Sequence, residues 1–362
     1  MIIVFYLHLR TTSAAQKDRT AWEVILSLDP LGLLLFVPAV VCILLALQVS
    51  KTLENHHTCK KAYKHQWGGT DYPWNSGRII ALFVISGILL VAFVLVQSRN
   101  GENATVPARI GLQRTVWASS LFIFCLFSAF FLLIYFLPIY FQAIHNLSPS
   151  ASGVASIPLI LSNVVSIAIT GGLITKFGFY VPYVYLCIVL TCIGCGLITT
   201  LDVHSGTAKW IGYQLLYGFG VGCALQIPNV ATQNVLPLED IPTGLAIVIL
   251  AQNFGPAVML SAGNNILNQK LVEYIAELDI EGFDPRAVLR AGATGFRNVV
   301  PEGYLESVLE AYNLALRQTF YLTLAMSCAA VVGGVFIEWK SVKNSAVREE
   351  EAVGSSDEGK GV

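Results

Sequence analysis

The sequence predicts an all-α integral membrane protein, a helical bundle of about eight transmembrane helices, on three observations. Hydrophobic residues make up 55% of the chain and charged residues 12%, whereas an average soluble domain carries roughly 25% charged residues. Eight apolar segments are long enough to cross a bilayer. Their apolar residues run continuously and do not alternate with polar ones, which favours helices over the strands of a membrane barrel.

A spanning helix needs roughly 20 apolar residues, because it must cross about 30 Å of hydrocarbon at about 1.5 Å per residue. Serines and a proline at 148–152 predict a loop before the fourth segment, and a periodic polar stretch before the last segment predicts an amphipathic helix. The eight predicted spans are 30–49, 78–98, 116–142, 153–175, 180–201, 210–233, 242–266 and 318–338.

Polarity and charge divide the chain into five parts. Lys and Arg are more frequent in the loops on the side of both termini, provided that 49–66 is left aside, which predicts cytoplasmic ends. The acidic, Gly/Ser-rich tail has nothing to bury and is predicted to be disordered. The parts are a cytoplasmic lead-in at 1–29, two helices at 30–98 with an inserted loop at 49–66, a cytoplasmic loop at 99–116, a six-helix bundle at 117–338 with a long extracellular loop at about 267–317, and a cytoplasmic tail at 339–362.

The sequence argues against other function classes. A net charge of −1 without a basic block argues against nucleic-acid binding. Neither an HExxH nor a GxSxG motif is present, so an enzyme is not expected, and no cofactor is implied. Cys192 and Cys195 form a CxxC in an uncharged span, which lacks the context of a redox site. The group His56, His57, Cys59 and His65 resembles a zinc site superficially, but its spacing fits no standard pattern, so no metal is predicted.

Polar residues gather in the sixth and seventh predicted spans, where amides facing lipid would be costly. We predict that Gln226, Asn229, Gln252 and Asn253 face a substrate cavity. Hydrogen bonding between helices is the alternative interpretation. No span holds a charged residue near its centre, so the sequence offers no carrier for a coupled proton. The whole polar set is Gln214, Gln226, Asn229, Gln233, Gln252, Asn253, Asn264 and Asn265.

Glycines and aromatic residues add two further predictions. Gly212, Gly218, Gly220 and Gly222 permit either close helix contact or bending in the sixth span, and Gly255 with Pro256 offers the same choice in the seventh. Tyr135 is a candidate for lining a cavity, as are Phe136, Tyr140 and Phe141; anchoring at the membrane interface is the alternative for all four.

Four stretches together resemble the fungal fourteen-span drug:proton antiporters of the major facilitator superfamily: LDPLGLLLFVPAVVCILLALQ, WGGTDYPWNSGRIIALF, GYQLLYGFGVGCALQIPNVATQNVLPLEDIPTG and EWKSVK. The resemblance covers nearly the whole chain. It implies two linker helices followed by the C-terminal six-helix bundle, with an N-terminal six-span half missing before Met1 and 1–29 as the end of a missing span. It also implies a plasma-membrane efflux pump that exchanges toxins, secondary metabolites or drugs for protons.

Two departures from the family pattern accompany this resemblance. GGLITKFGFY is similar to a degenerate copy of the family's cytoplasmic loop motif; it keeps Gly172, Lys176 and Gly178 but has Thr175 in place of Asp. The loop 49–66 interrupts a family-like join, which suggests a retained intron. Alternatives therefore stay open: a truncated, inactive or assembly-dependent protein, or a membrane channel or receptor.

Overall fold

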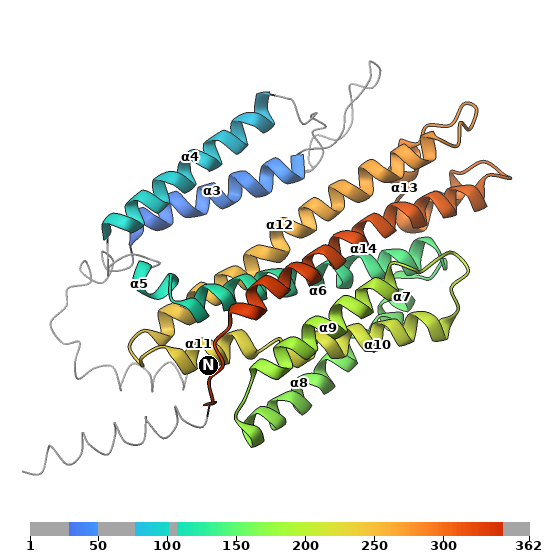
Figure 1. Cartoon of the computed structure of the whole chain (residues 1–362). Coiled ribbons are helices and arrows are strands. Elements are labelled where there is room, and N and C mark those ends of the chain that lie inside the picture. Colours follow the sequence, from blue (N-terminus) through green and yellow to red (C-terminus); the bar gives the residue numbers. More distant parts are fainter. Residues whose placement is uncertain (1–28, 50–76, 101–106, 343–362) are drawn as a thin grey trace, which may run out of the picture.

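Long helices run side by side along a common direction, as Figure 1 shows for the computed structural model. The structure describes residues 29–49, 77–100 and 107–342, and these ranges are almost wholly α-helical. The long helices are α3 (Pro30–Val49), α4 (Gly77–Asn100), α6 (Arg114–Ala143), α8 (Ile157–Phe177), α9 (Val181–Ile198), α10 (Thr207–Ala224), α12 (Ile241–Ala276) and α14 (Leu305–Phe336). The short ones are α5 (Ala108–Gly111), α7 (Pro149–Ala155), α11 (Ile227–Val235), α13 (Arg286–Gly295) and the 3₁₀ turn η3 (Phe296–Asn298).

Length and composition support a membrane protein. Within the described ranges, six helical segments are long and apolar enough to cross a bilayer: Ile79–Arg99, Arg114–Ala143, Pro149–Phe177, Val181–Ile198, Ile241–Ala276 and Leu305–Phe336. Pro30–Ala46 is a shorter apolar helix. The predicted all-α membrane bundle is therefore confirmed, and the remaining predicted span, 210–233, has a different structure described below.

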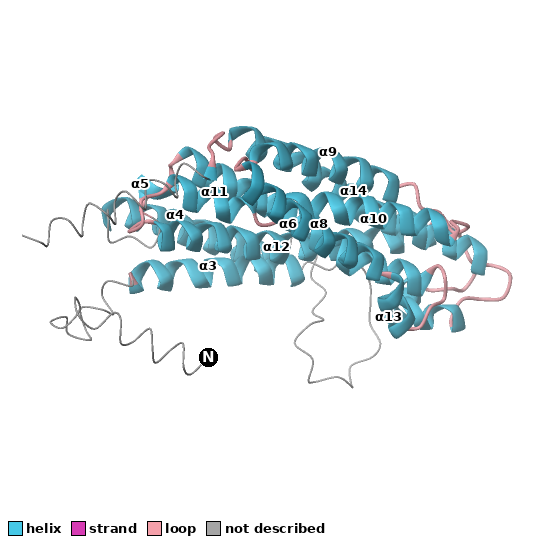
Figure 2. Ribbon diagram, turned by 90° about the horizontal axis from the view of Figure 1, so that it is seen from below, coloured by secondary structure: helices cyan, strands magenta, loops and turns pink. Residues whose placement is uncertain are grey.

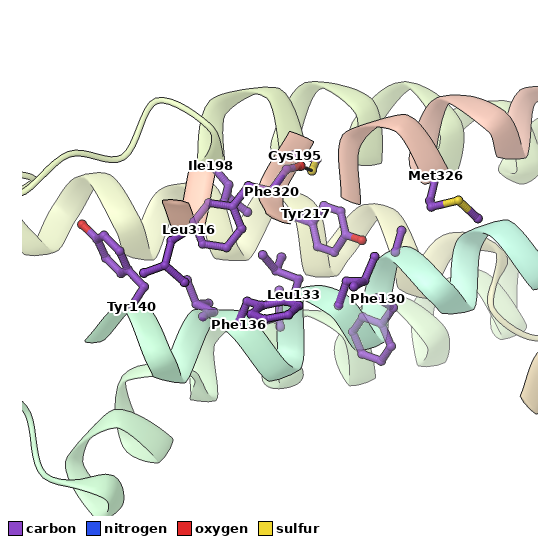
Figure 3. Close-up of a cluster of buried hydrophobic side chains, with 14 of the residues drawn as sticks. Phe130, Leu133, Phe136, Tyr140, Cys195, Ile198, Tyr217, Leu316, Phe320 and Met326 are labelled. Carbon is purple, nitrogen blue, oxygen red and sulfur yellow. Dashed lines mark hydrogen bonds between the residues drawn. The ribbon is translucent and has the colours of Figure 1, made fainter. Parts of the chain in front are cut away.

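Helix α6 lies at the centre of the bundle. It packs against α14 and α12 along its length and also contacts α11, while α10 lies between α8 and α9. Figure 2 shows the same bundle from below, with α3 beside α12 at one side of the stack. Figure 3 shows Tyr217 of α10 among buried side chains of α6, α9 and α14, such as Leu133 and Phe320.

Close approach between helices depends on glycine at some contacts. A Cβ on Gly333 of α14 would lie 2.5 Å from the backbone nitrogen of Phe122 in α6. A Cβ on Gly194 of α9 would lie 2.8 Å from Cα of Tyr217. In lipid the hydrophobic effect does not drive helices together, so such small-residue contacts supply packing energy.

The pair α3 and α4 forms its own hairpin-like unit against α12. Gln97 Nε2 donates to Asp29 Oδ2 over 2.6 Å at one end, and Ser86 Oγ donates to the carbonyl oxygen of Ala39 over 2.9 Å. Arg109 of α5 forms two hydrogen bonds, of 2.7 and 2.8 Å, to Asp240 at the start of α12. The first two bonds join α3, with the residue that precedes it, to α4, and the pair of Arg109 with Asp240 joins α5 to the start of α12.

Two segments predicted as loops contain helices in the structure. Residues 148–152 are not a loop: Ser148 caps α7 through a 3.2 Å hydrogen bond from the backbone nitrogen of Ala151, and Pro149 occupies a first-turn position. The predicted loop 267–317 is largely helical, because α12 continues to Ala276, α13 intervenes, and α14 already begins at Leu305. The amphipathic stretch is thus the first part of α14, where hydropathy falls while the helix continues.

Other predictions fall outside the described residues. These are the lead-in up to residue 28, the inserted segment from 50 onwards with His56, His57, Cys59 and His65, and the tail from 343 onwards.

Candidate functional site

The sixth predicted span is broken into two helices. Helix α10 ends at Ala224, Leu225 and Gln226 form a turn, and α11 begins at Ile227. Pro228 explains the break, because it has no N–H to donate to the carbonyl oxygen of Ala224 and its ring clashes with that carbonyl. The predicted span 210–233 is thus interrupted in the structure, and the bend lies C-terminal to the glycines.

The glycines of α10 are contact points. A Cβ on Gly218 would overlap the carbonyl oxygen of Leu159 in α8, and one on Gly222 would lie 2.7 Å from Cβ of Ser166. A Cβ on Gly220 would lie 2.8 Å from Cβ of Leu190 in α9. Small residues at these three positions therefore let α10 approach both of its neighbours.

A hydrogen bond adds to this contact between α8 and α10. Ser166 Oγ donates to the carbonyl oxygen of Phe219 over 2.6 Å and lies 3.3 Å from Cys223 Sγ. Gly212 differs from the other glycines of this helix, because no atom lies within 4 Å of its added Cβ. Gly212 therefore lies on an exposed face of α10, away from these contacts.

A pocket of about 460 Å³ opens where α10 gives way to α11. It is lined mostly by apolar side chains, with the Gln226 amide, Thr170 and Thr175 as polar groups. Its composition fits an apolar or amphipathic small molecule. The lining residues are Ile167, Thr170, Gly171, Ile174, Thr175, Gly222, Cys223, Gln226, Ile227, Val230 and Val342.

Two amides of α11 and the amide of its N-cap residue share one face. Gln226, Asn229 and Gln233 are spaced as i, i+3 and i+7, and all three are exposed or half-buried. Asn229 Nδ2 donates to Gln226 Oε1 over 3.4 Å, whereas Asn229 Oδ1 is buried without a hydrogen-bond partner in the described structure. A buried, unpaired amide oxygen is costly, which makes this face a candidate for ligand or water contact.

The amides of α12 have a different setting. Asn253 is exposed, but its Nδ2 donates to the carbonyl oxygen of Ile249 in its own helix over 2.8 Å, and Gln252 is half-buried. Neither lines the pocket. Of the four predicted amides, only Gln226 does so, and the structure does not gather all four around one cavity.

Gln214 contacts another part of the fold. Its Nε2 donates to the carbonyl oxygen of Ala155 in α7 over 3.1 Å, although its Oε1 is buried without a partner. Gln214 therefore fits the alternative interpretation of the polar residues, in which an amide forms a hydrogen bond between two helices.

The aromatic residues of α6 separate into two groups. Tyr135 is 44% exposed and Phe131 is 37% exposed, and the rings of Phe127 and Phe131 lie 5.0 Å apart. These three are spaced i, i+4 and i+8 and mark the open face of α6. Phe136, Tyr140 and Phe141, by contrast, are fully buried and do not line the pocket at α10–α11. The Tyr140 hydroxyl donates to the carbonyl oxygen of Asp202 over 2.8 Å.

Gly255 and Pro256 do not interrupt α12, which runs unbroken from Ile241 to Ala276. A Cβ on Gly255 would lie 2.5 Å from Ser128 Oγ and 2.6 Å from the carbonyl oxygen of Phe124. This glycine therefore lies at a close contact with α6, which supports the packing interpretation at this position.

The turn between α8 and α9 contains the loop motif. Gly178 adopts φ 83° and caps α8, with its N–H bonded to the carbonyl oxygen of Ile174. Val342 donates its backbone N–H to the carbonyl oxygen of Gly178 over 2.8 Å, so the chain after α14 lies against this turn and forms part of the pocket wall. Gly172 has open space around it, and the Lys176 ammonium lies 5.7 Å from the ring centre of Phe177.

Sequence reasoning missed part of the site. Thr170 and Cys223 line the pocket, but a threonine and a cysteine in apolar spans carry no sequence signal. Among the described residues, no group of three or more His, Cys, Asp or Glu could hold a metal ion. Arg317 is the charged residue farthest from the ends of α14, and its Nε donates to the carbonyl oxygen of Thr199 beyond the end of α9.

The sequence pattern of the Major Facilitator Superfamily matches residues 65–260. The chain belongs to this family. Members of the superfamily are membrane transporters and not enzymes. The chain is therefore a multi-pass membrane protein of this transporter family.

Relatives in this superfamily are named as fungal efflux pumps. The chain is 41% identical over 347 residues to the "MFS-type efflux pump MFS1" of Arthroderma benhamiae, covering 96% of this chain and 61% of that protein. It is 41% identical over 345 residues to "Efflux pump aflT" of Aspergillus parasiticus, covering 95% of this chain and 63% of the relative.

A third relative is the "MFS acetylaranotin efflux transporter ataA" of Aspergillus terreus, which is 40% identical over 341 residues, covering 94% of this chain and 71% of the relative. The chain thus spans about 60 to 70% of the length of these relatives.

Proposed function

We propose that this chain is the C-terminal part of a secondary-active exporter of small organic molecules, such as toxins, secondary metabolites or drugs. The observation that carries the proposal is the broken helix α10–α11, whose polar face adjoins an apolar pocket in a bundle related to named efflux pumps. Discontinuous helices around polar groups are a recurring device of transporters, because they present backbone and amide groups to a cavity and not to lipid.

In this proposal the full-length protein also has an N-terminal six-span half, and the two halves rock around a central site. The proposal assigns the spans to the last eight of a fourteen-span exporter, with α3 and α4 as the linker pair. Gln226 and Asn229 contact the substrate from the α11 side, Gln252 and Asn253 from α12, and Tyr135 offers its ring from α6.

Proton coupling is part of the proposal for the full-length protein in the plasma membrane. The coupled proton needs a titratable group inside the membrane. The described helices have no Asp or Glu in their central turns, so the proposal assigns the proton-binding carboxylate to the N-terminal half.

The test compares the chain alone with the chain joined to the upstream spans that full-length cDNA from its locus encodes. Both are expressed in yeast that lacks its own drug exporters, and the efflux of a panel of dyes and fungal toxins is measured with and without a protonophore. We expect export only from the joined protein, abolished by the protonophore. Ion conduction by the chain alone would instead indicate a channel, and a transcript without upstream spans would contradict the two-half architecture.

The same cDNA tests the inserted segment. We infer that 49–66 is a retained intron, so most transcripts should lack it and should keep the reading frame. A segment present in every transcript would contradict this inference.

The assigned residues have a test of their own. Replacing Gln226, Asn229, Gln252 and Asn253 together by Ala should reduce export by the joined protein at least about ten-fold, the effect of losing roughly 1.4 kcal/mol of binding. Unchanged export by a normally expressed variant would reject the assigned site. Replacement of Asn298, an exposed amide in η3 that does not line the pocket, is the matched surface control.

A further inference from the structure

Two cysteines far apart in the sequence meet on the surface of the bundle. Cys192 of α9 and Cys328 of α14 place their sulfur atoms 3.6 Å apart, and both thiols are free. In the sequence Cys192 shares a CxxC with Cys195. Cys195 is instead fully buried and directs its Sγ to the carbonyl oxygen of Phe320, 3.7 Å away (Figure 3).

The pair lies on a lipid-facing surface. Cys328 is exposed and Cys192 is half-buried. Apolar neighbours on both helices are exposed as well: Ile193 is 51% exposed on α9, and Val332 is 52% exposed on α14. In a membrane protein such a surface faces acyl chains, so apolar reagents dissolved in the bilayer can reach the two thiols.

The two sulfur atoms lie only slightly farther apart than those of a disulfide bond. A disulfide needs a sulfur–sulfur distance of about 2.05 Å, and rotation of the side chains must close the remaining gap of about 1.5 Å. Helices α9 and α14 already pack against each other, so their backbones need no large movement. The other cysteines on described helices are Cys42, Cys125, Cys187, Cys195 and Cys223, and none of them has a sulfur–sulfur contact of this kind.

We propose that Cys192 and Cys328 form an oxidisable dithiol, which closes to a disulfide between α9 and α14 when the bilayer contains lipid hydroperoxides. The two thiols give up two electrons and two protons, and one S–S bond forms. The hydroperoxide accepts these electrons and protons as its O–O bond breaks. The products are a lipid alcohol and one water molecule. The reaction needs no group from the polar site, so the proposal does not rest on the proposed export function.

The disulfide joins two helices of the same bundle. No residue of α9 or α14 lines the pocket at α10–α11. A bond at this place therefore restrains the bundle without covering the polar face. It closes a covalent loop between residues 136 positions apart, which limits the unfolded chain and raises stability.

The experiment counts free thiols in the full chain, purified in detergent. The chain carries Cys59→Ser, because Cys59 lies outside the described residues. The protein is treated with cumene hydroperoxide, denatured, and labelled with a maleimide–polyethylene glycol that shifts each free thiol on a gel. We expect two fewer labels after oxidation, full recovery with dithiothreitol, and a cross-linked pair of peptides containing Cys192 and Cys328 in mass spectra.

Matched variants decide the assignment. Cys192→Ser and Cys328→Ser should each abolish the loss of labels, whereas Cys195→Ser should keep it. The melting temperature should rise by a few degrees on oxidation only when both Cys192 and Cys328 are present. Loss of two labels in Cys328→Ser, a Cys192–Cys195 peptide, or no reversible loss in any form would overturn the proposal.

Discussion

Two proline-containing helices of this bundle respond differently to the same residue. Pro228 separates α10 from α11, whereas Pro256 leaves α12 continuous over 36 residues. At Pro228 the chain turns at Leu225 and Gln226, and the amides of α11 share an open face beside a pocket. At Pro256 the adjoining Gly255 packs against Ser128 and Phe124 of α6. The difference teaches that a proline alone does not decide whether a membrane helix is interrupted, because the contacts around the two prolines differ.

The substitution with the largest expected effect tests the contact between α10 and α8, just before α10 ends. Gly218→Ala should destabilise the protein by about 3 kcal/mol, because the new Cβ overlaps the backbone carbonyl of Leu159, which cannot move away by side-chain rotation. Thermal unfolding in detergent, followed by size-exclusion chromatography, measures the effect. Gly212→Ala in the same helix meets no atom within 4 Å and should be neutral; equal losses in both variants would contradict the assigned contact.

Exchanging the prolines tests the comparison directly. Pro228→Ala restores an N–H for the carbonyl oxygen of Ala224 and should favour one continuous helix, which moves Gln226 away from the pocket. Export by the full-length protein should then fall at least about ten-fold with unchanged expression, whereas Pro256→Ala should keep most of the export. Dye efflux from cells is the measurement, and equal behaviour of the two variants would argue against a role for the break.

Pairs of amides separate the contributions of α11 and α12. Gln226→Ala with Asn229→Ala should reduce export more than Gln252→Ala with Asn253→Ala, because Asn253 already bonds to Ile249 within its own helix. We expect roughly a five-fold difference in transport rate, equivalent to about 1 kcal/mol. Dose–response curves for one exported toxin provide the measurement. A larger loss from the α12 pair would move the substrate site to that helix.

The smallest expected effect concerns a single hydrogen bond between helices. Ser166→Ala removes the 2.6 Å bond to the carbonyl oxygen of Phe219 and should cost about 0.6 kcal/mol, the average for such bonds in membranes. Ser120→Ala is the control, since Ser120 donates to Val116 within its own helix. The melting temperature should fall slightly more for Ser166→Ala, and an identical fall would show that the contact between helices adds nothing.

Sequence patterns predicted the helical membrane fold well, because continuous apolar runs of this length have few other structures available in lipid. They did not predict which proline breaks a helix, since Pro138, Pro228 and Pro256 all lie in apolar stretches and only tertiary contacts distinguish them. They did predict a helix in the polar stretch before the last apolar segment, but not that this helix is continuous with the span as the first part of α14.

Within the site, the sequence did not reveal how each helix is rotated about its own axis, and therefore which side chains face the open side. Tyr135 and Phe136 are neighbours in sequence, yet the first is 44% exposed and the second is fully buried. An amphipathic pattern normally reveals this rotation, but α6 is apolar on every face, so hydropathy cannot tell its open side from its packed side. The amides of α11 could be predicted because polar residues stand out against apolar neighbours; the threonine and cysteine of the pocket do not.

The length of α12 has a practical consequence for structural work. Its 36 residues correspond to about 54 Å, well beyond the roughly 30 Å of a hydrocarbon core. Together with α13 and the first turns of α14, its far end therefore forms a projection at the end of the molecule opposite to the connection between α8 and α9 (Figure 1). Such a projection offers an epitope for conformation-specific antibody fragments, which would enlarge a small membrane protein for cryo-electron microscopy without touching the transport pathway.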